Sequence, residues 1–242
     1  MEESKTVVMP IWQRRILKDL ERLQSCSDDF NEDGIYFHYD ESDLSKLFVV
    51  ITGASNTPYA DVPFLFLFTF PANYQHMPPV VKFCTGDGKT RFNPNLYIDG
   101  KVCLSILGTW AGPGWTPVMN IVTVIKSIQA LVMTDTPLLN EPGLESASSE
   151  RIKLYNIVLE YRSLMVGLVG QLKSCPEIFM PLLRRIEERF RRDFGRIMER
   201  VEKNLLQDGK EISDSYFGKW SIDFGEVKRE LLDLGTKFGL SP

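Results

Sequence analysis

Histidine is nearly absent from this sequence, whose 242 residues contain only His38 and His76. Histidine is the side chain that most often transfers protons near neutral pH, and its neutral ring is a common metal ligand. The shortage argues against a histidine-dependent hydrolase and against a histidine metal site. Any enzymatic proton transfer must depend on other side chains, and we expect neither a metal nor a cofactor.

Cysteine is also sparse, and the four cysteines form no CxxC pair. They are Cys26, Cys84, Cys103 and Cys175. A small disulfide-stapled fold and a zinc ribbon are excluded, because both need cysteines at dense and regular spacing. Thiols spread in this way are typical of proteins in a reducing compartment.

Long apolar runs and a basic excess are missing as well. The longest apolar block, 64–70, is far shorter than the roughly 20 residues that cross a bilayer, and the N-terminus lacks the basic and apolar regions of a signal peptide. The net charge of -4 offers no electrostatic footprint for nucleic acid. We therefore expect a soluble protein of the cytoplasm, or also of the nucleus, with no membrane and no nucleic-acid partner.

The residues that are present, 43% hydrophobic and 25% charged, are typical of a globular protein. Residues 10–26 place apolar side chains every three or four positions, which predicts an amphipathic helix. The opposite side of this helix is basic, and it is either a solvated face or a docking surface for an acidic partner. It comprises Arg14, Arg15, Lys18 and Arg22.

Four short β-rich runs follow, separated by turn residues, and predict an antiparallel meander. They cover 35–39, 47–51, 64–70 and 80–83. The third run is apolar on both faces, which indicates a central strand. Residues 84–117 then show no period and are rich in Gly, Pro, Asn and Trp. An irregular stretch of that length inside a domain is usually functional.

Helical spacing returns after the irregular stretch. The predicted helices cover 118–133, 152–172 and 178–206, and a closing turn with a short helix covers 217–240. The fold class is therefore mixed α/β (α+β). The length fits either one large domain or one domain with a helical appendage. We expect the second, with a domain at 1–147 and a helical C-terminal extension at 148–242.

Gly86–Thr90 looks like the end of a phosphate-binding loop, but the match fails. The glycine required five positions before Gly88 is Phe83. The strand that should precede such a loop and the helix that should follow it are missing too. We interpret the segment as a hairpin turn.

Cys103 taken alone would be a buried, inert side chain, but its surroundings indicate more. Upstream stands Arg91–Tyr97, which spells RFNPNLY, and Asp99-Gly100 sets a tight turn just before the cysteine. Downstream, Trp115-Thr116-Pro117 directly precedes a predicted helix. The cysteine therefore lies inside an ordered series of turn and motif residues.

This series resembles the ubiquitin-conjugating enzymes, the middle enzymes of the ATP-dependent ubiquitin cascade. Their motif has a His-Pro-Asn triplet, an eight-residue step from its asparagine to the catalytic cysteine, and a Trp-Ser-Pro triplet before a helix. Asn95 and Cys103 are likewise eight residues apart. The resemblance covers residues 10–147. It is strongest for the Z type, with which the chain shares Gly108-Thr109-Trp110 and Asn140-Glu141-Pro142-Gly143.

The resemblance implies that Cys103 carries ubiquitin, or a ubiquitin-like modifier, as a thioester and passes it to a lysine amine. Asn95 matches a residue that donates a hydrogen bond to the reaction's oxyanion, and its alternative role is to brace the active-site loop. Glu141 matches an acidic loop residue that orients the lysine and takes its proton. Its alternative is an exposed loop carboxylate.

The resemblance also implies partner surfaces. The basic helix face matches the surface that meets the ubiquitin-activating enzyme and the ubiquitin ligase, while His76, Trp115 and Pro117 match loops that contact ligases. We expect the extension to set specificity for the activating enzyme. The alternative function is a non-catalytic module on the same fold that binds ubiquitin or a partner. A cysteine hydrolase is disfavoured because it would need a paired imidazole.

Overall fold

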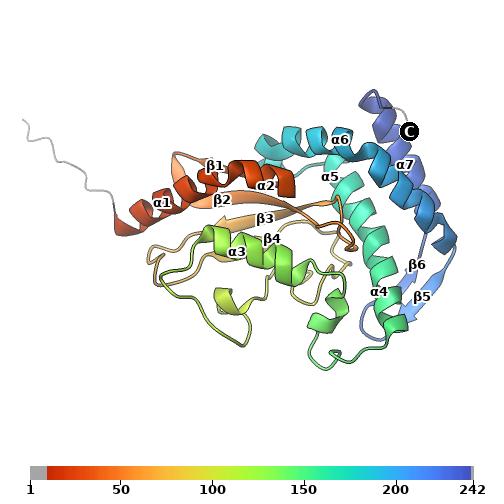
Figure 1. Ribbon diagram of the computed structural model, residues 1–242, viewed down its shortest axis with the longest axis horizontal. Helices are drawn as coiled ribbons and strands as arrows, with labels where there is room; N and C mark the ends of the chain where they lie inside the picture. The colour runs from red at the N-terminus through yellow and green to blue at the C-terminus, as the bar shows by residue number, and fades with distance from the viewer. Residues whose placement is uncertain (1–9, 241–242) are drawn as a thin grey trace, which may run out of the picture.

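The computed structural model describes residues 10–240, and its centre is a four-stranded antiparallel sheet (Figure 1). The strands are β1 (Ile35–Asp40), β2 (Asp43–Thr52), β3 (Pro63–Thr69) and β4 (Val80–Phe83), and they pair in chain order. The predicted meander and mixed fold class are confirmed. β2 is longer than predicted because its polar first residues extend the pairing with β1, as far as Asp43 opposite Asp40.

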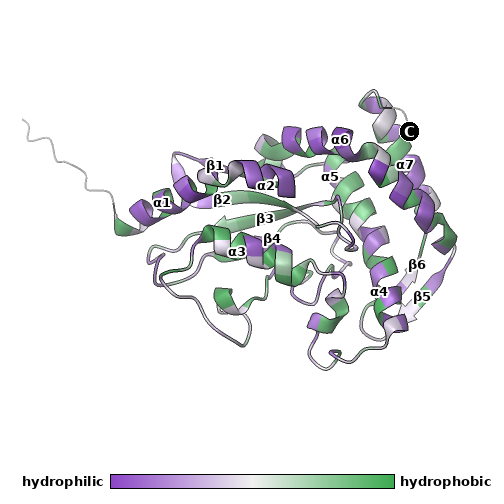
Figure 2. Ribbon diagram, viewed as in Figure 1, coloured by the Kyte–Doolittle hydropathy of each residue, from purple (hydrophilic) through white to green (hydrophobic). Residues whose placement is uncertain are grey.

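β3 lies between β2 and β4, in agreement with its two apolar faces. Phe66 stands opposite Val49 on β2 and Phe83 on β4, and all three side chains are buried. The hydropathy colours show apolar residues along β2 and β3 and hydrophilic residues on the outer sides of the surrounding helices (Figure 2). A strand buried on both faces has to exclude polar side chains, since each would need a partner in the interior.

The helix predicted at 10–26 is present as α1 (Ile11–Ser25). A second helix, α2 (Ser27–Asp33), was not predicted, because its sequence SDDFNED contains a single apolar residue and no helical period. It ends at Gly34, whose φ of 73° lies in the left-handed region that favours glycine. The chain then turns directly into β1.

The inner face of α1 carries a buried charge. Asp19 is fully buried and accepts a hydrogen bond of 2.6 Å from the Tyr74 hydroxyl. The guanidinium groups of Arg15 and Arg22 each lie 3.3 Å from Asp19 Oδ1 and neutralise it. Burial, and then the carboxylate beside it, raise the pKa of Tyr74, so the phenol remains a hydrogen-bond donor. The cluster fastens α1 to the loop after β3.

Tyr74→Phe is expected to lower the free energy of unfolding by about 1.5–3 kcal/mol, the usual worth of a hydrogen bond to a charged group. The aromatic ring still packs against Phe70 and Trp115, so the loss reports on the hydroxyl. Urea denaturation measures the difference. Tyr39→Phe is the control, because the Tyr39 hydroxyl accepts only an exposed hydrogen bond from Gln24. Equal stability of the Tyr74 variant and the native protein would show that the two arginines alone satisfy Asp19.

The helix predicted at 118–133 is confirmed as α3 (Ile121–Ser127), which continues in a π-helical turn through Val132. It begins later than predicted because Asn120 is its N-cap. The Asn120 Oδ1 accepts a hydrogen bond of 3.1 Å from the Thr123 amide, which satisfies a backbone donor in the first turn. The residues just before Asn120 therefore belong to the irregular segment.

Gly86–Thr90 is a bend and not the predicted hairpin turn. The chain beyond it returns to β4 only at an isolated bridge between Lys82 and Lys101. Asp87 shapes the bend, since its Oδ1 accepts hydrogen bonds of 3.0 and 2.7 Å from the amides of Lys89 and Thr90. The Asp87 carboxylate thus accepts hydrogen bonds from backbone amides, which in a hairpin would be bonded to a paired strand.

The C-terminal extension is helical for most of its length, and it also contains a β-hairpin. Its helices are α4 (Ser149–Arg162), α5 (Gly170–Lys173), α6 (Met180–Asn204) and α7 (Phe224–Lys237). The hairpin pairs β5 (Glu211–Asp214) with β6 (Gly218–Ser221), so the predicted closing turn is in part a strand. The two strands have four residues each and are largely exposed, and for that reason no apolar alternation marked them.

The extension shares its hydrophobic core with the rest of the chain. Buried side chains from both parts form one contiguous cluster. Gly167, between α4 and α5, lies so close to the sheet that an added Cβ would be 2.4 Å from Val62 Cγ1. α6 packs against β1, which is an edge strand (Figure 1). The two parts are therefore folded against each other, and the functional boundary at residue 147 stays a prediction.

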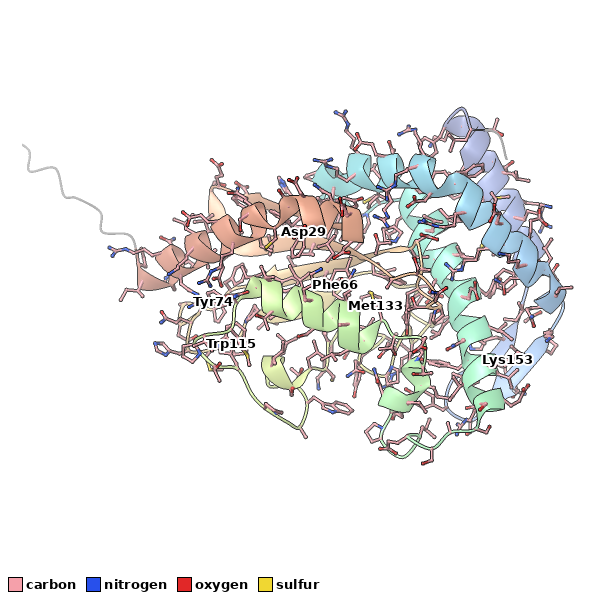
Figure 3. All side chains as sticks on the ribbon, in the orientation of Figure 1. Asp29, Phe66, Tyr74, Trp115, Met133 and Lys153 are labelled. Atoms are coloured by element: carbon pink, nitrogen blue, oxygen red, sulfur yellow. The ribbon has the colours of Figure 1, made fainter. Side chains whose placement is uncertain are left out.

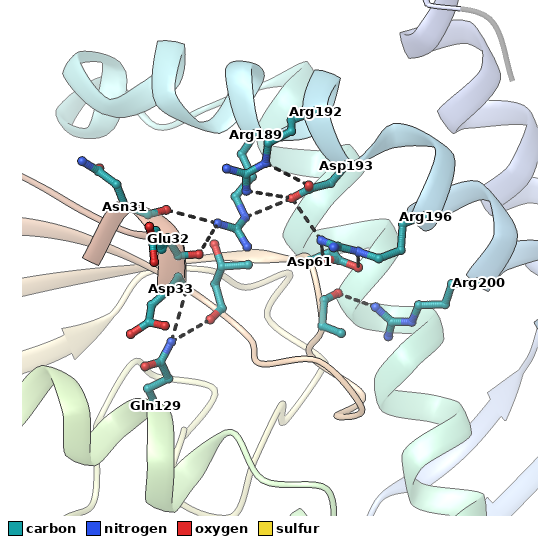
Figure 4. A network of polar contacts seen from close by, with 12 residues as sticks. Asn31, Glu32, Asp33, Asp61, Gln129, Arg189, Arg192, Asp193, Arg196 and Arg200 are labelled. Atoms are coloured by element: carbon teal, nitrogen blue, oxygen red, sulfur yellow. Dashed lines mark hydrogen bonds and ion pairs between the residues drawn. The ribbon is translucent and has the colours of Figure 1, made fainter. Parts of the chain in front are cut away.

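Arginine side chains on α6 bind the end of α2 and the segment before β3, and so link the extension to the rest of the chain (Figure 4). Arg189 donates hydrogen bonds of 3.5 and 3.4 Å to the carbonyls of Asn31 and Glu32, at the end of α2. Arg196 forms an ion pair with Asp61, just before β3. These contacts bridge segments more than 100 residues apart, so they form only when the extension docks.

Arg200 continues this row and contacts two segments at once. It donates to the carbonyls of Ala60 and Pro58, the latter at 3.1 Å, and pairs with Glu160 on α4. Arg200→Lys is expected to lower the free energy of unfolding by about 1–3 kcal/mol. The single ammonium of lysine cannot reach all the partners that the N–H groups of the planar guanidinium contact. Thermal unfolding measures the loss, with the exposed Arg184→Lys as control. An unchanged midpoint would mean that packing alone holds α6.

Candidate active site

Cys103 lies in the irregular segment after β4 and is 1% exposed. Its backbone N–H donates a hydrogen bond of 2.9 Å to the carbonyl of Asn95. Between these residues the chain reverses at Gly100, whose φ is 92° and where an added Cβ would lie 2.7 Å from the Phe83 carbonyl oxygen. A glycine is required there for both reasons. The turn expected before the cysteine thus brings Asn95 and Cys103 side by side.

The side chain of Asn95 completes this reversal. Its Nδ2 donates a hydrogen bond of 2.7 Å to the carbonyl of Cys103, and its backbone N–H donates one of 2.8 Å to Asn93 Oδ1. Asn95 is 7% exposed, and its Oδ1 has no hydrogen-bond partner among the residues that the structure describes. The bracing contact is therefore present. A side-chain amide has a second N–H, which the Cys103 carbonyl does not use.

Asn93 anchors the reversal to the core. Its Nδ2 donates hydrogen bonds of 2.7 Å to the carbonyl of Val132 and 3.0 Å to the Tyr59 hydroxyl. Tyr59 in turn donates one of 2.7 Å to the carbonyl of Phe92. Burial raises the pKa of Tyr59, so the phenol stays neutral. The end of the α3 region and the loop before β3 thereby hold the active-site segment in place.

Tyr97 belongs to the site, although in the sequence it stood out only as a member of the motif. It lies on the reversal that holds Cys103, where its backbone N–H donates a hydrogen bond of 2.9 Å to the carbonyl of Lys101. Burial, followed by the Cys103 thiol, raises the pKa of Tyr97. The Arg91 guanidinium carbon is 4.5 Å from the centre of the Tyr97 ring, and the Lys101 ammonium is 5.5 Å from it. His38 lies on β1, and therefore on the far edge of the sheet from β4, the strand that leads to the thiol.

Glu141 follows the α3 region, as expected from its loop motif, and two side chains hold it. Arg91 Nη2 lies 3.4 Å from Glu141 Oε2, and the Tyr216 hydroxyl donates a hydrogen bond of 2.7 Å to the same oxygen. Tyr216 lies between β5 and β6, so the extension reaches the site. Arg91 also covers the Tyr97 ring, which connects this group to Cys103. In the sequence, Arg91 was marked only by its place in the RFNPNLY string.

The four basic residues of α1 divide into two pairs. Arg14 and Lys18 are exposed. Arg15 turns inward and donates a hydrogen bond of 3.0 Å to the carbonyl of Pro117, and Arg22 joins the buried ion pair described above. Arg14 and Lys18 therefore present their charge to solvent, whereas Arg15 and Arg22 hold α1 in place.

His76, Trp115 and Pro117 come together beside α1. Trp115 Nε1 donates a hydrogen bond of 3.2 Å to the carbonyl of the residue before His76. The Trp115 ring centre is 5.9 Å from that of Tyr74, and the two side chains are seen next to each other in Figure 3. His76 and Pro117 are exposed, while Trp115 is half-buried. Because Arg15 links Pro117 to α1, the loop residues and the basic helix share one region of the surface.

Residues 10–240 also lack two other kinds of feature. No helix in that range is long and apolar enough to cross a bilayer. The same residues contain no group of three or more histidine, cysteine, aspartate or glutamate side chains that could hold a metal ion. The described site itself presents thiol, amide, phenol, carboxylate and guanidinium groups.

Comparison with known proteins adds independent information. A sequence model of the family described as ubiquitin-conjugating enzyme matches residues 15–156. Ubiquitin-conjugating enzyme E2 Z of Danio rerio is 45% identical over 149 residues, which cover 60% of this chain and 45% of that protein. The dual E2 ubiquitin-conjugating enzyme/E3 ubiquitin-protein ligase BIRC6 of Homo sapiens is 30% identical over 247 residues, which cover 95% of this chain and 5% of that protein.

A solved structure is also similar. The E2 domain of a Toxoplasma gondii ubiquitin conjugating enzyme superposes with a TM-score of 0.50 and 26% identity, over 64% of this chain and 98% of that domain. The relatives themselves are longer than the matched part. The chain spans 45% of the Danio rerio E2 Z, 59% of the Xenopus tropicalis E2 Z and 25% of a Caenorhabditis elegans conjugating enzyme.

Proposed function

This chain belongs to the ubiquitin-conjugating enzyme family and resembles the E2 Z type, and on that premise we propose that it carries ubiquitin, or a ubiquitin-like modifier, as a thioester on Cys103 and transfers it to a lysine amine. The observation that carries this proposal is the pair of hydrogen bonds between Asn95 and Cys103, one in each direction. A cysteine that only fills the core needs no such scaffold.

In the first step of the proposed reaction, the Cys103 thiolate attacks the carbonyl carbon of the modifier's C-terminal thioester on the activating enzyme. The new sulfur–carbon bond forms as the activating enzyme's thiolate leaves, so no oxidant or metal is needed. A strongly activating imidazole would be a disadvantage here, because it would also activate water against the thioester. Cys103 is 1% exposed, so the side chains around it have to open before the attack.

In the second step, a lysine amine attacks the thioester carbonyl and creates a tetrahedral oxyanion. The free N–H of the Asn95 side chain is the proposed donor to that oxygen. The bracing hydrogen bond to the Cys103 carbonyl supports this role, because it holds the amide beside the reacting sulfur. Collapse of the intermediate forms the amide bond and releases the Cys103 thiolate. Donors of this kind typically contribute about 10² to 10³ in rate.

The acceptor lysine must lose a proton, since a free lysine with a pKa of about 10.4 is protonated at neutral pH. Glu141 is the proposed group that orients the amine and receives its proton, a contribution of roughly 10² to 10⁴ in such sites. Its side chain is 24% exposed, which leaves it within reach of an incoming substrate. The proton then passes to solvent.

The same proposal implies partner proteins and the surfaces that bind them. Arg14 and Lys18 on α1 are proposed contacts of the ubiquitin-activating enzyme and of a ubiquitin ligase, with His76, Trp115 and Pro117 as ligase contacts. The extension from residue 148, which packs on the rest of the chain through a shared core, is proposed to set specificity for the activating enzyme. The four cysteines form no disulfides, which supports a cytoplasmic or nuclear location.

A charging assay tests the proposal. Purified full-length protein incubated with activating enzyme, ATP and ubiquitin should form an adduct that is seen without reductant and lost with it. The rival function is a non-catalytic module that binds ubiquitin or a partner without charging. If no activating enzyme and no modifier yields the adduct while ubiquitin still binds, the rival is correct.

A further inference from the structure

The hairpin of the extension brings the Tyr216 hydroxyl into contact with Glu141, the proposed proton acceptor. We propose that Tyr216 is a positioning residue that, through its hydrogen bond to Glu141, aims this carboxylate at the incoming lysine. The inference rests on the proposed function and deepens it. Both parts of the chain then contribute to the region of the site that receives the lysine, because Glu141 follows α3 and Tyr216 lies between β5 and β6.

The contacts of Glu141 are divided unequally between its two oxygens. Oε2 accepts the hydrogen bond of 2.7 Å from Tyr216 and lies 3.4 Å from Arg91 Nη2. Within residues 10–240, no hydrogen bond reaches Oε1, and this atom is not among the buried unsatisfied ones. One oxygen is therefore held while the other stays open. This is the arrangement that a carboxylate needs to accept a proton from an amine without leaving its place.

Tyr216 is itself fixed before any substrate arrives. Its backbone N–H donates a hydrogen bond of 2.7 Å to Asp214 Oδ1. Arg151 on α4 donates two further hydrogen bonds of 2.8 and 2.9 Å to Asp214. This contact is the main cause of the lowered pKa of Asp214. The Tyr155 ring packs edge-on at 6.3 Å between centres. Little side-chain freedom is left to lose when the acceptor binds, which favours positioning.

The same cluster extends to the reacting cysteine. The Arg91 guanidinium carbon lies 4.5 Å from the ring centre of Tyr97 and 5.4 Å from that of Tyr216, so it is shared by both phenols. Burial, and then the contact with Glu141, raise the pKa of Tyr216, which keeps it a donor at any working pH. The Cys103 thiol in turn contributes to the raised pKa of Tyr97. Through Arg91 the hairpin thus reaches Tyr97, on the reversal that also holds Cys103.

Three variants test the inference: Tyr216→Phe, Glu141→Gln and the double variant. Each is first charged with ubiquitin, and discharge of the purified thioester is then followed in a single turnover with free lysine. Tyr216→Phe keeps the ring and removes only the hydroxyl. It should discharge to lysine about tenfold more slowly, a part of the 10² to 10⁴ that a positioned base supplies. In the Glu141→Gln background the same change should cost nothing more.

Hydroxylamine separates positioning from a general structural role. This nucleophile is mainly unprotonated at neutral pH, so no side chain has to remove a proton before it attacks, and the proton lost after attack can pass to water. Tyr216→Phe should therefore leave its rate unchanged. Tyr161→Phe is the matched control, since the Tyr161 ring packs on Phe224 within the extension. Equal slowing with lysine and hydroxylamine, an additive loss in the double variant, or native discharge by Tyr216→Phe would each overturn the inference. Failure of the native protein to charge would instead overturn the proposed function.

Discussion

Cys103→Ser is expected to abolish the reducible adduct completely. Serine has nearly the same shape, so the hydrogen bonds between the backbone of this residue and Asn95 can persist. Its hydroxyl is far less acidic than a thiol, whose pKa is near 8.5, and it attacks a thioester slowly. The product, if one forms, is an oxyester that survives reductant. Charging with activating enzyme, ATP and ubiquitin, analysed with and without reductant, measures the change.

Cys84→Ser is the matched control for this result. Cys84 lies in the same segment after β4 but is only partly buried, and this burial raises the pKa of its thiol, which makes it a poor nucleophile. The Cys84 variant should charge like the native protein. An adduct of Cys103→Ser that remains reducible and equally abundant would remove Cys103 from the mechanism, and loss of charging in Cys84→Ser would show that the site is larger than proposed.

Asn95→Ala is expected to slow discharge of the thioester to lysine by about 10² to 10³, the effect of removing one oxyanion donor. The reason is that the amide lies beside the reacting cysteine and has a second N–H to offer. Single-turnover discharge of the charged variant measures the rate. Charging carried to completion should still give the thioester, because the nucleophile is intact.

A second variant separates oxyanion stabilisation from bracing. Tyr59→Phe removes the hydroxyl that Asn93 and the carbonyl of Phe92 use, and so loosens the scaffold while leaving Asn95 itself in place. If Asn95 donates to the oxyanion, Tyr59→Phe slows discharge far less than Asn95→Ala at a comparable loss of stability. Equal slowing by the two variants would assign Asn95 to bracing alone.

The four strands and most helices could be predicted because their signals are local. β3 is buried on both sides, so its sequence is apolar throughout, and α1 shows its buried face as a helical period. α2 gave no such signal, since only Phe30 of its seven residues is buried. The hairpin of β5 and β6 was missed for the same reason, because its strands are short, largely exposed and without apolar alternation.

In the candidate site, too, local contacts could be predicted from the sequence and long-range contacts could not. Asn95 and Cys103 are joined by a short reversal at Gly100, so their proximity follows from a local pattern. Arg15 was expected on an exposed basic face, but the backbone carbonyls of the 115–119 loop draw it inward. A partner of that kind leaves no trace in the spacing of charged residues.

The sequence by itself determined the meander, the first helix, the turn that sets Cys103 beside Asn95 and the family that this turn indicates. Only the tertiary structure decided that Tyr216 of the extension holds Glu141, and that one hydrophobic core joins the two parts of the chain. The physical reason is range. Turns and amphipathic periods arise from neighbours a few residues apart, whereas Glu141 and Tyr216 are 75 residues apart and meet only when burial of the shared core brings their elements together.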